Sequence, residues 1–225
     1  FPTIQSAVDA AVDGDTVLVA DGVYYGEGNR DVSFDGKLIS VQSENGPEYC
    51  IISSGGSLSD EHRAFFFFNS ESADAIVSGF TIQDGYITNS LGGAGILCYS
   101  ASPTITNCRF ENNTSERYGG AVSLWSSSCT ITDVDFLSNT ASTGGAIYLS
   151  LSVLTLSECM FQSNSSYCVS VDSQSDLRVT VSLFDGNSFA IRGESECNLE
   201  LDGCTFTQGT FGGISCPSHG TSVIS

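Results

Sequence analysis

The chain has 225 residues with 26 acidic side chains and only seven lysines and arginines, which gives a net charge of −19. This charge excludes nucleic acid as a partner, because contacts to phosphate backbones require lysine and arginine. No apolar run in this stretch reaches the length of a membrane-spanning helix, so no membrane span is expected in it.

The first residues predict a short helix and then strands. Apolar residues recur at helical spacing from Ile4 to Ala11, with Thr3 as the expected N-cap and Gly14 as the expected stop. Residues 1–14 are therefore predicted to be a helical cap over the first rung of a solenoid. Residues 15–74 are predicted to form irregular opening coils, with strands near 15–20, 38–41 and 50–53. A further strand, Ala64–Phe68, is predicted to be too apolar for exposure on either face.

Residues 75–225 are predicted to form regular repeat coils. Phe110, Phe136, Phe161, Phe184 and Phe206 follow one another at intervals of 22 to 26 residues, and the first four begin a Phe-x-x-Asn tetrapeptide. An aliphatic residue lies five positions before each Phe, and Gly119-Gly-Ala-Val122 and Gly144-Gly-Ala-Ile147 lie between the early copies. Self-similarity of this period predicts a solenoid, so residues 1–225 are expected to form one all-β domain that is part of a longer chain.

The repeat also predicts which side chains point inward. Ile105, Cys108 and Phe110 occupy apolar columns, and the step of three residues from Ile105 to Cys108 requires the strand to bend. Asn113 and its equivalents are expected to bind turn backbone and to stack their amides from coil to coil; a row of metal or sugar ligands is the alternative. The Gly-Gly pairs are expected to supply positive φ and close backbone approach.

The nine cysteines leave two interpretations open. An oxidising compartment favours disulfides, with an odd number leaving one thiol free. However, Cys108 and Cys159 share one column two coils apart, roughly 9.6 Å at the usual strand spacing, which is too far for a bridge. That column predicts small buried thiols instead.

Several motifs resemble a known family. Phe110-Glu-Asn-Asn113 and Gly144-Gly-Ala-Ile147 are similar to repeats of polymorphic outer-membrane proteins and of the wider right-handed parallel β-helix proteins. The opening Thr3-Ile-Gln and the later Gly14-Asp-Thr-Val resemble the start of secreted pectin-lyase-like chains. The resemblance implies a right-handed parallel β-helix with three sheets and a secreted or cell-surface location. It implies no reaction, since this fold hosts enzymes and non-enzymes alike.

The leading functional prediction is non-catalytic: a rigid stalk, an adhesin, or a component of an extracellular matrix or fibre. Its expected partners are polysaccharide or neighbouring copies of the same chain. The alternative is an enzyme of the pectin-lyase-like fold, a polysaccharide lyase or a glycoside hydrolase. A third hypothesis is ice binding, because Thr104, Thr106, Thr130 and Thr132 would form hydroxyl ladders on one outward face.

A lyase needs a base and a cation to neutralise a uronate, and few residues qualify. The candidates are Lys37, Arg63, Arg109, Arg117 with Tyr118, Arg178 and Arg192. Arg109 and Asp135 share one outward column and are the candidate catalytic pair; an exposed ion pair without function is the alternative.

No organic cofactor is expected, and calcium is the one cofactor that the acidic residues suggest. Asp133, Asp135 and Glu158 lie on neighbouring coils and are the candidate metal ligands. Asp172, Asp176, Glu194 and Glu196 are also expected on outward columns, and these outward acids are expected to bind calcium only weakly.

Overall fold

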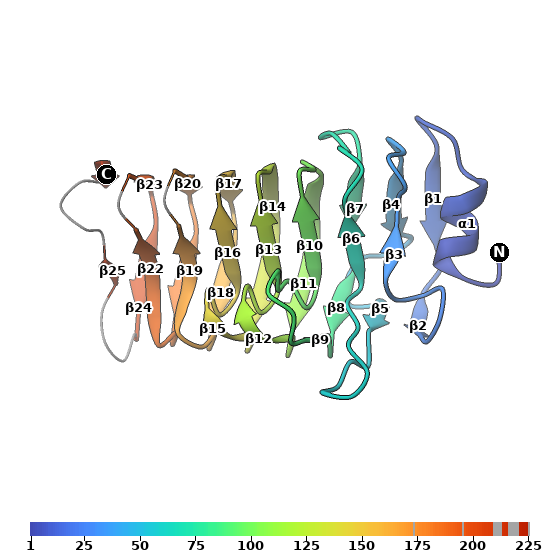
Figure 1. Ribbon diagram of the computed structural model, residues 1–225, viewed down its shortest axis with the longest axis horizontal. Coiled ribbons are helices and arrows are strands. Elements are labelled where there is room, and N and C mark those ends of the chain that lie inside the picture. The colour runs from blue at the N-terminus through green and yellow to red at the C-terminus, as the bar shows by residue number, and fades with distance from the viewer. Residues whose placement is uncertain (173, 195, 209–212, 216–220, 225) are drawn as a thin grey trace.

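A computed structural model of the chain describes residues 1–172, 174–194, 196–208, 213–215 and 221–224. The chain winds into a parallel solenoid whose strands stack side by side along the long axis, with helix α1 (Ile4–Ala10) closing the N-terminal end (Figure 1). The predicted all-β parallel coil with a short helical cap is confirmed.

Helix α1 begins where the sequence predicts and ends earlier. Thr3 and Ser6 form a capping box, in which the Thr3 hydroxyl accepts from Ser6 N at 3.2 Å and the Ser6 hydroxyl accepts from Thr3 N at 3.1 Å. The predicted stop at Gly14 is wrong. The helix ends at Ala10, because Ala11 turns to extended backbone and buries its side chain in the core.

The strands form three parallel sheets. The first sheet contains β1 (Thr16–Val19), β4 (Ser40–Ser43), β7 (Ile76–Ser78), β11 (Thr104–Glu111), β14 (Ser128–Leu137), β17 (Val153–Ser157), β20 (Asp176–Thr180), β23 (Asn198–Asp202) and β26 (Thr221–Ile224). It continues sideways into β2 (Gly22–Tyr25), β5 (Cys50–Ser53), β8 (Thr81–Gln83), β18 (Met160–Gln162), β21 (Leu183–Asp185) and β24 (Thr205–Thr207).

The second sheet contains β3 (Val32–Ser33), β6 (Phe65–Phe67), β10 (Ile96–Tyr99), β13 (Val122–Trp125), β16 (Ile147–Ser150), β19 (Tyr167–Val171), β22 (Phe189–Gly193) and β25 (Ile214–Ser215). The third is short and holds β9 (Tyr86–Ile87), β12 (Thr114–Tyr118) and β15 (Thr140–Thr143). Three sheets agree with the number that the resemblance implies.

The bend predicted between the aliphatic and cysteine columns lies at one residue per coil. The residue three positions before each Phe, or before Ile82 in the first regular coil, has positive φ: Gly79, Asn107, Asp133, Glu158, Val181 and Gly203. A left-handed residue here turns the chain within the first sheet, so that residues on both sides of it point inward.

Two inward columns hold the coils in register. The rings of Phe110, Phe136, Phe161 and Phe184 stack with centroids 4.7 to 5.3 Å apart and planes within 8° of parallel. Beside them each Asn donates its amide to the next coil's Asn at 3.1 Å, from Asn113 through Asn139 and Asn164 to Asn187. All four Asn side chains are buried, so the predicted amide ladder is confirmed and the alternative ligand row is not formed.

The prediction that Ala64–Phe68 is buried on both faces is wrong. Phe65 and Phe67 are fully buried, but Phe66 is only partly buried and Phe68 is 41% exposed. Only one face of β6 meets the core, since successive side chains of a strand point to opposite sides. The outward phenylalanines begin a row of aromatic side chains on the second sheet.

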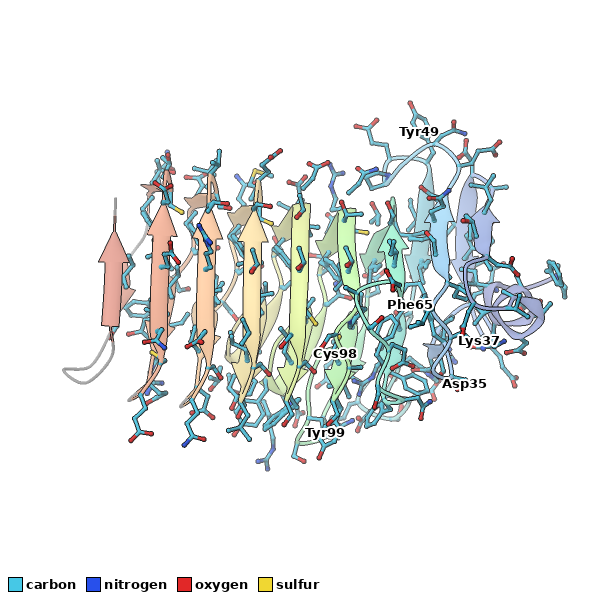
Figure 2. The ribbon with its side chains drawn as sticks, turned by 90° about the horizontal axis from the view of Figure 1, so that it is seen from above. Asp35, Lys37, Tyr49, Phe65, Cys98 and Tyr99 are labelled. Atoms are coloured by element: carbon cyan, nitrogen blue, oxygen red, sulfur yellow. The ribbon has the colours of Figure 1, made fainter. Side chains whose placement is uncertain are left out.

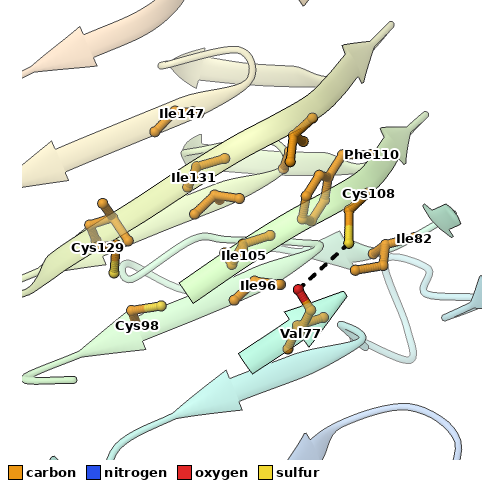
Figure 3. Close-up of a cluster of buried hydrophobic side chains, with 14 of the residues drawn as sticks. Val77, Ile82, Ile96, Cys98, Ile105, Cys108, Phe110, Cys129, Ile131 and Ile147 are labelled. Atoms are coloured by element: carbon orange, nitrogen blue, oxygen red, sulfur yellow. Dashed lines mark hydrogen bonds between the residues drawn. The ribbon is translucent and has the colours of Figure 1, made fainter. Parts of the chain in front are cut away.

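Cys50, Cys98, Cys108, Cys129, Cys159, Cys168 and Cys204 are free thiols, and all of these but Cys204 are buried. Cys197 is also buried, and Cys216 lies outside the described residues. Figure 3 shows Cys108 among apolar side chains, with its thiol donating to Val77 O at 3.9 Å. Burial raises the pKa of the Cys108 and Cys159 thiols to about 12, against weaker opposing effects of neighbouring backbone groups. The predicted column of small buried thiols is confirmed.

Native protein at pH 8 is expected to resist alkylation at Cys108 and Cys159. Because the thiolate is the reactive form, a pKa near 12 makes labelling slower than at a free cysteine by on the order of 1,000-fold. Peptide mapping after iodoacetamide treatment measures this, with urea-unfolded protein as the control that labels fully. Rapid native labelling of either residue would contradict the described packing.

Candidate functional site

The predicted pair Arg109 and Asp135 is brought together. The two residues are register partners on β11 and β14, their side chains are 3.6 Å apart, and each is 34% exposed. Partial burial raises the pKa of Asp135, although Arg109 acts in the opposite direction. Along the same column they are flanked by Thr81 and Met160, neither of which is a second acid or base. The arrangement is that of a half-exposed ion pair.

The predicted metal ligands Asp133, Asp135 and Glu158 do not converge. No group of three or more His, Cys, Asp or Glu side chains within the described ranges has an arrangement that could hold a metal ion. Asp133 and Glu158 occupy the bend of their coils and point to solvent, whereas Asp135 turns to Arg109. Acidic residues on neighbouring coils therefore do not form a shared site here.

The predicted threonine ladders are in register. Thr104 pairs with Thr130 and Thr130 with Thr155, and the Thr132 and Ser157 hydroxyls lie 3.0 Å apart. The next residues in the Thr155 column are Arg178 and Glu200, which end the flat hydroxyl surface. Ice binding by this short surface stays a prediction.

The outer face of the second sheet carries aromatic side chains in sequence along the axis. Phe68 stacks on Tyr99 at 5.5 Å with planes 14° apart, and Tyr99 is the register partner of Trp125. Tyr99 lies at an edge of the molecule, whereas its chain neighbour Cys98 lies inside the outline (Figure 2). The Trp125 ring lies 5.2 Å from that of Tyr148, one coil further on. We call these residues (Phe68, Tyr99, Trp125 and Tyr148) the aromatic row.

The row ends in a cleft of about 200 Å³ that we call the aromatic cleft. Its walls come from β12, β15, β16, β19 and β22, so two sheets and successive coils contribute. The residues used below are Tyr118, Tyr148, Ser170, Asp172, Arg192 and Glu194. The Tyr118 ring packs 4.4 Å from that of Tyr148 and 5.6 Å from that of Trp125, so the cleft is continuous with the row.

One side of the cleft offers hydrogen-bond acceptors. The Tyr148 hydroxyl donates to Asp172 Oδ2 at 2.6 Å, and burial together with this bond raises the pKa of the Tyr148 phenol. Tyr148 is therefore protonated at neutral pH and does not suit the role of a general base. Ser170 is 4% exposed, and its hydroxyl has no hydrogen-bond partner among the residues that the structure describes. An unpartnered buried hydroxyl is costly, so a water molecule or a ligand group is expected to complete its hydrogen bonding.

The other side holds a cation that is already partnered. Arg192 forms an ion pair with Glu194 at 2.5 Å and lies over the Tyr167 ring, 5.8 Å from its centroid. Ser170 and Arg192 are register partners, so the polar groups are one coil apart. The cleft thus combines aromatic surface with a few fixed polar groups, as small-molecule sites do.

Sequence reasoning singled out some residues of this site, but for other roles. Tyr118 and Arg192 were candidates for lyase chemistry, and Asp172 and Glu194 were among the outward acids, but nothing in the repeat joined them. Trp125 and Tyr148 were missed. The available signal was an aromatic residue at an outward position of the strand that follows each Gly-Gly-Ala motif.

Comparisons with known proteins agree with this architecture. The family described as the right handed beta helix region matches residues 21–225, so the chain belongs to that family. Among solved structures it is similar to pectin methylesterase from carrot, with 12% identity, a TM-score of 0.49 and coverage of 100% of this chain and 85% of the other. It is also similar to an alginate lyase from Paenibacillus sp. str. FPU-7, with 11% identity, a TM-score of 0.46 and coverage of 97% and 96%.

These likenesses concern the course of the chain, and no residue role is transferred from either enzyme. A search of curated sequences finds no significant match. Within the described residues, no helix combines the length and apolarity that crossing a bilayer would require.

Proposed function

We propose that the chain is a non-catalytic β-helix of a secreted or cell-surface protein, a rigid stalk or adhesin that holds a glycan in the aromatic cleft. The observation that carries the proposal is the cleft itself, in which Tyr118 and Tyr148 face polar groups on Ser170, Asp172 and Arg192. Sugar rings have apolar C–H faces and hydroxyl edges, so aromatic rings beside fixed hydrogen-bonding groups complement both.

The solenoid supports the mechanical part of the proposal. Each coil is tied to the next by strand pairing, by the phenylalanine stack and by the Asn ladder. Such a structure is stiff along its axis and presents its outer faces in fixed register, which suits presentation of a binding site away from a surface.

A second candidate is an enzyme, and two carboxylates favour it. Asp172 and Glu194 both line the cleft, on successive coils of the second sheet, and hydrolysis of a glycosidic bond uses a pair of carboxyl groups. Incubation with neutral and acidic polysaccharides, followed by measurement of reducing ends and unsaturated products, separates the two candidates. Turnover that is lost in Glu194→Gln would replace the binding proposal by the enzyme.

Replacing Tyr118 with alanine is expected to weaken glycan binding by about 10-fold or more, because a stacking wall of the cleft is lost. Trp125 is the only tryptophan of the chain and its ring contacts Tyr118 and Tyr148, so its fluorescence reports occupancy during titration with oligosaccharides. Tyr25→Ala is the matched control, since Tyr25 is 73% exposed on β2. Equal affinity of the Tyr118→Ala and Tyr25→Ala variants would contradict the assignment of the cleft.

A further inference from the structure

The charge of the aromatic cleft restricts which sugars it can accept. It is lined by the carboxylates of Asp172 and Glu194 and by one cation, Arg192. That cation is held by Glu194 at 2.5 Å and by the Tyr167 ring. An anionic sugar could bind Arg192 only by breaking the ion pair between Arg192 and Glu194. The Glu194 carboxylate would then lie unpaired beside the negative charge of the sugar.

The net charge of the whole chain also disfavours anionic sugars. With 26 acidic residues against seven lysines and arginines, the molecule repels a polyanion as it approaches. The aromatic row that leads to the cleft, from Phe68 through Tyr99 to Trp125, consists of uncharged side chains, so it offers nothing to balance a line of carboxylates. The carboxylates of a uronate polymer would therefore be repelled by the protein without a cation nearby to offset the repulsion.

The polar groups on this wall of the cleft can accept hydrogen bonds. The Ser170 hydroxyl is buried without a hydrogen-bond partner in the described part of the chain, and the Asp172 carboxylate, which accepts from the Tyr148 hydroxyl, lines the same cleft as the Tyr118 and Tyr148 rings. A protonated amine is a donor with three N–H groups and no acceptor, and it is also attracted to aromatic faces. Hydroxyl, carboxylate and ring faces together form the surroundings that an ammonium group requires.

We infer that the aromatic cleft selects glycans with protonated amino groups, such as deacetylated amino sugars, over uronate glycans. The inference rests on the proposed glycan-binding function and adds the ligand class to it. The ammonium of the sugar lies against Asp172 and the tyrosine faces, and its ring hydroxyls reach Ser170.

Three oligosaccharides of equal length test the inference: glucosamine, N-acetylglucosamine and galacturonate oligomers, titrated by calorimetry and by Trp125 fluorescence. The glucosamine oligomer is expected to bind about 10-fold more tightly than the N-acetylated one, and the galacturonate oligomer most weakly. Raising NaCl from about 0.02 M to about 0.2 M is expected to weaken only the glucosamine complex several-fold, because salt screens the charges.

The results separate this inference from the function on which it rests. Binding of the N-acetylated or galacturonate oligomer as tightly as the glucosamine oligomer would overturn the ligand class and leave glycan binding in place. Binding of no oligomer, whatever its charge, would overturn both.

Asp172→Asn tests the charge without removing the hydrogen bond, since the amide oxygen can still accept from the Tyr148 hydroxyl. This variant is expected to lose about 10-fold in affinity for the glucosamine oligomer and to bind the N-acetylated oligomer within about 2-fold of wild type. Glu200→Gln is the matched control, because it changes the net charge equally and lies in an exposed pair with Arg178 on the first sheet. Equal losses in the two variants would show that only the overall charge matters and would overturn the assignment to the cleft.

Discussion

Alanine at position 145 is expected to destabilise the protein by about 4 kcal/mol or more. A Cβ on Gly145 would lie 1.9 Å from the carbonyl oxygen of Ser165 and 2.9 Å from its nitrogen. Ser165 cannot withdraw freely, because its N–H donates to Asn139 O at 3.0 Å and so connects successive coils. Urea unfolding followed by circular dichroism measures the change.

Gly213→Ala is the matched control for Gly145→Ala. A Cβ on Gly213 meets no atom of the described residues within 4 Å. Gly213 occupies the same place in its coil as Ala146 and Ala190 do in theirs, because Ile214, Ile147 and Ile191 belong to one register column. Its expected effect is within about 0.5 kcal/mol of zero. If Gly145→Ala unfolded at the same urea concentration as this control, the close approach between coils would be wrong.

Asn139→Ala is expected to cost about 3 kcal/mol, because it breaks the Asn ladder in the middle. The Asn139 amide donates to Phe110 O at 2.9 Å and to Asn164 Oδ1 at 3.1 Å, and its oxygen accepts two bonds from Asn113 at 3.1 Å. Alanine provides none of these, and the partners stay buried without their bonds.

The control for the ladder is Asn198→Ala. Asn198 is exposed on β23 and donates to Asp176 at 2.6 Å, so its loss is expected to cost no more than about 0.5 kcal/mol. Both variants are compared by their urea midpoints under one set of conditions. A midpoint for Asn139→Ala as high as that for Asn198→Ala would mean that the ladder contributes no stability.

The fold was predictable from the sequence because a solenoid converts sequence period into spatial contact. Phe136 meets Phe110 and Phe161 since all three occupy the same place in successive coils, and the same holds for the Asn residues three positions later. The bend at Asn107 and Asp133 followed from the odd step between two inward columns. Errors arose where the repeat is absent, as at the helix end near Ala11.

The candidate site was less predictable, for the same physical reason. A column in the sequence reports which residues stack along the axis, but it does not report which sheets meet around a cleft. Tyr118 lies on the third sheet and Tyr148 on the second, and their rings touch only because the Gly-Gly turns bring the sheets together. The opposite error concerns the candidate metal ligands Asp133, Asp135 and Glu158. The sequence period placed them near one another, but the bend at Asp133 and Glu158 turns the side chains apart, so they form no site.

The sequence by itself therefore determined the parallel coil, the inward columns and the buried thiols, because each depends on one residue and its copies a coil away. Only the tertiary structure decided that Phe66 and Phe68 face outward, that Arg192 is held by Glu194, and that the Ser170 hydroxyl has no hydrogen-bond partner among the described residues. These facts depend on contacts between different positions of the repeat, for which the period carries no information.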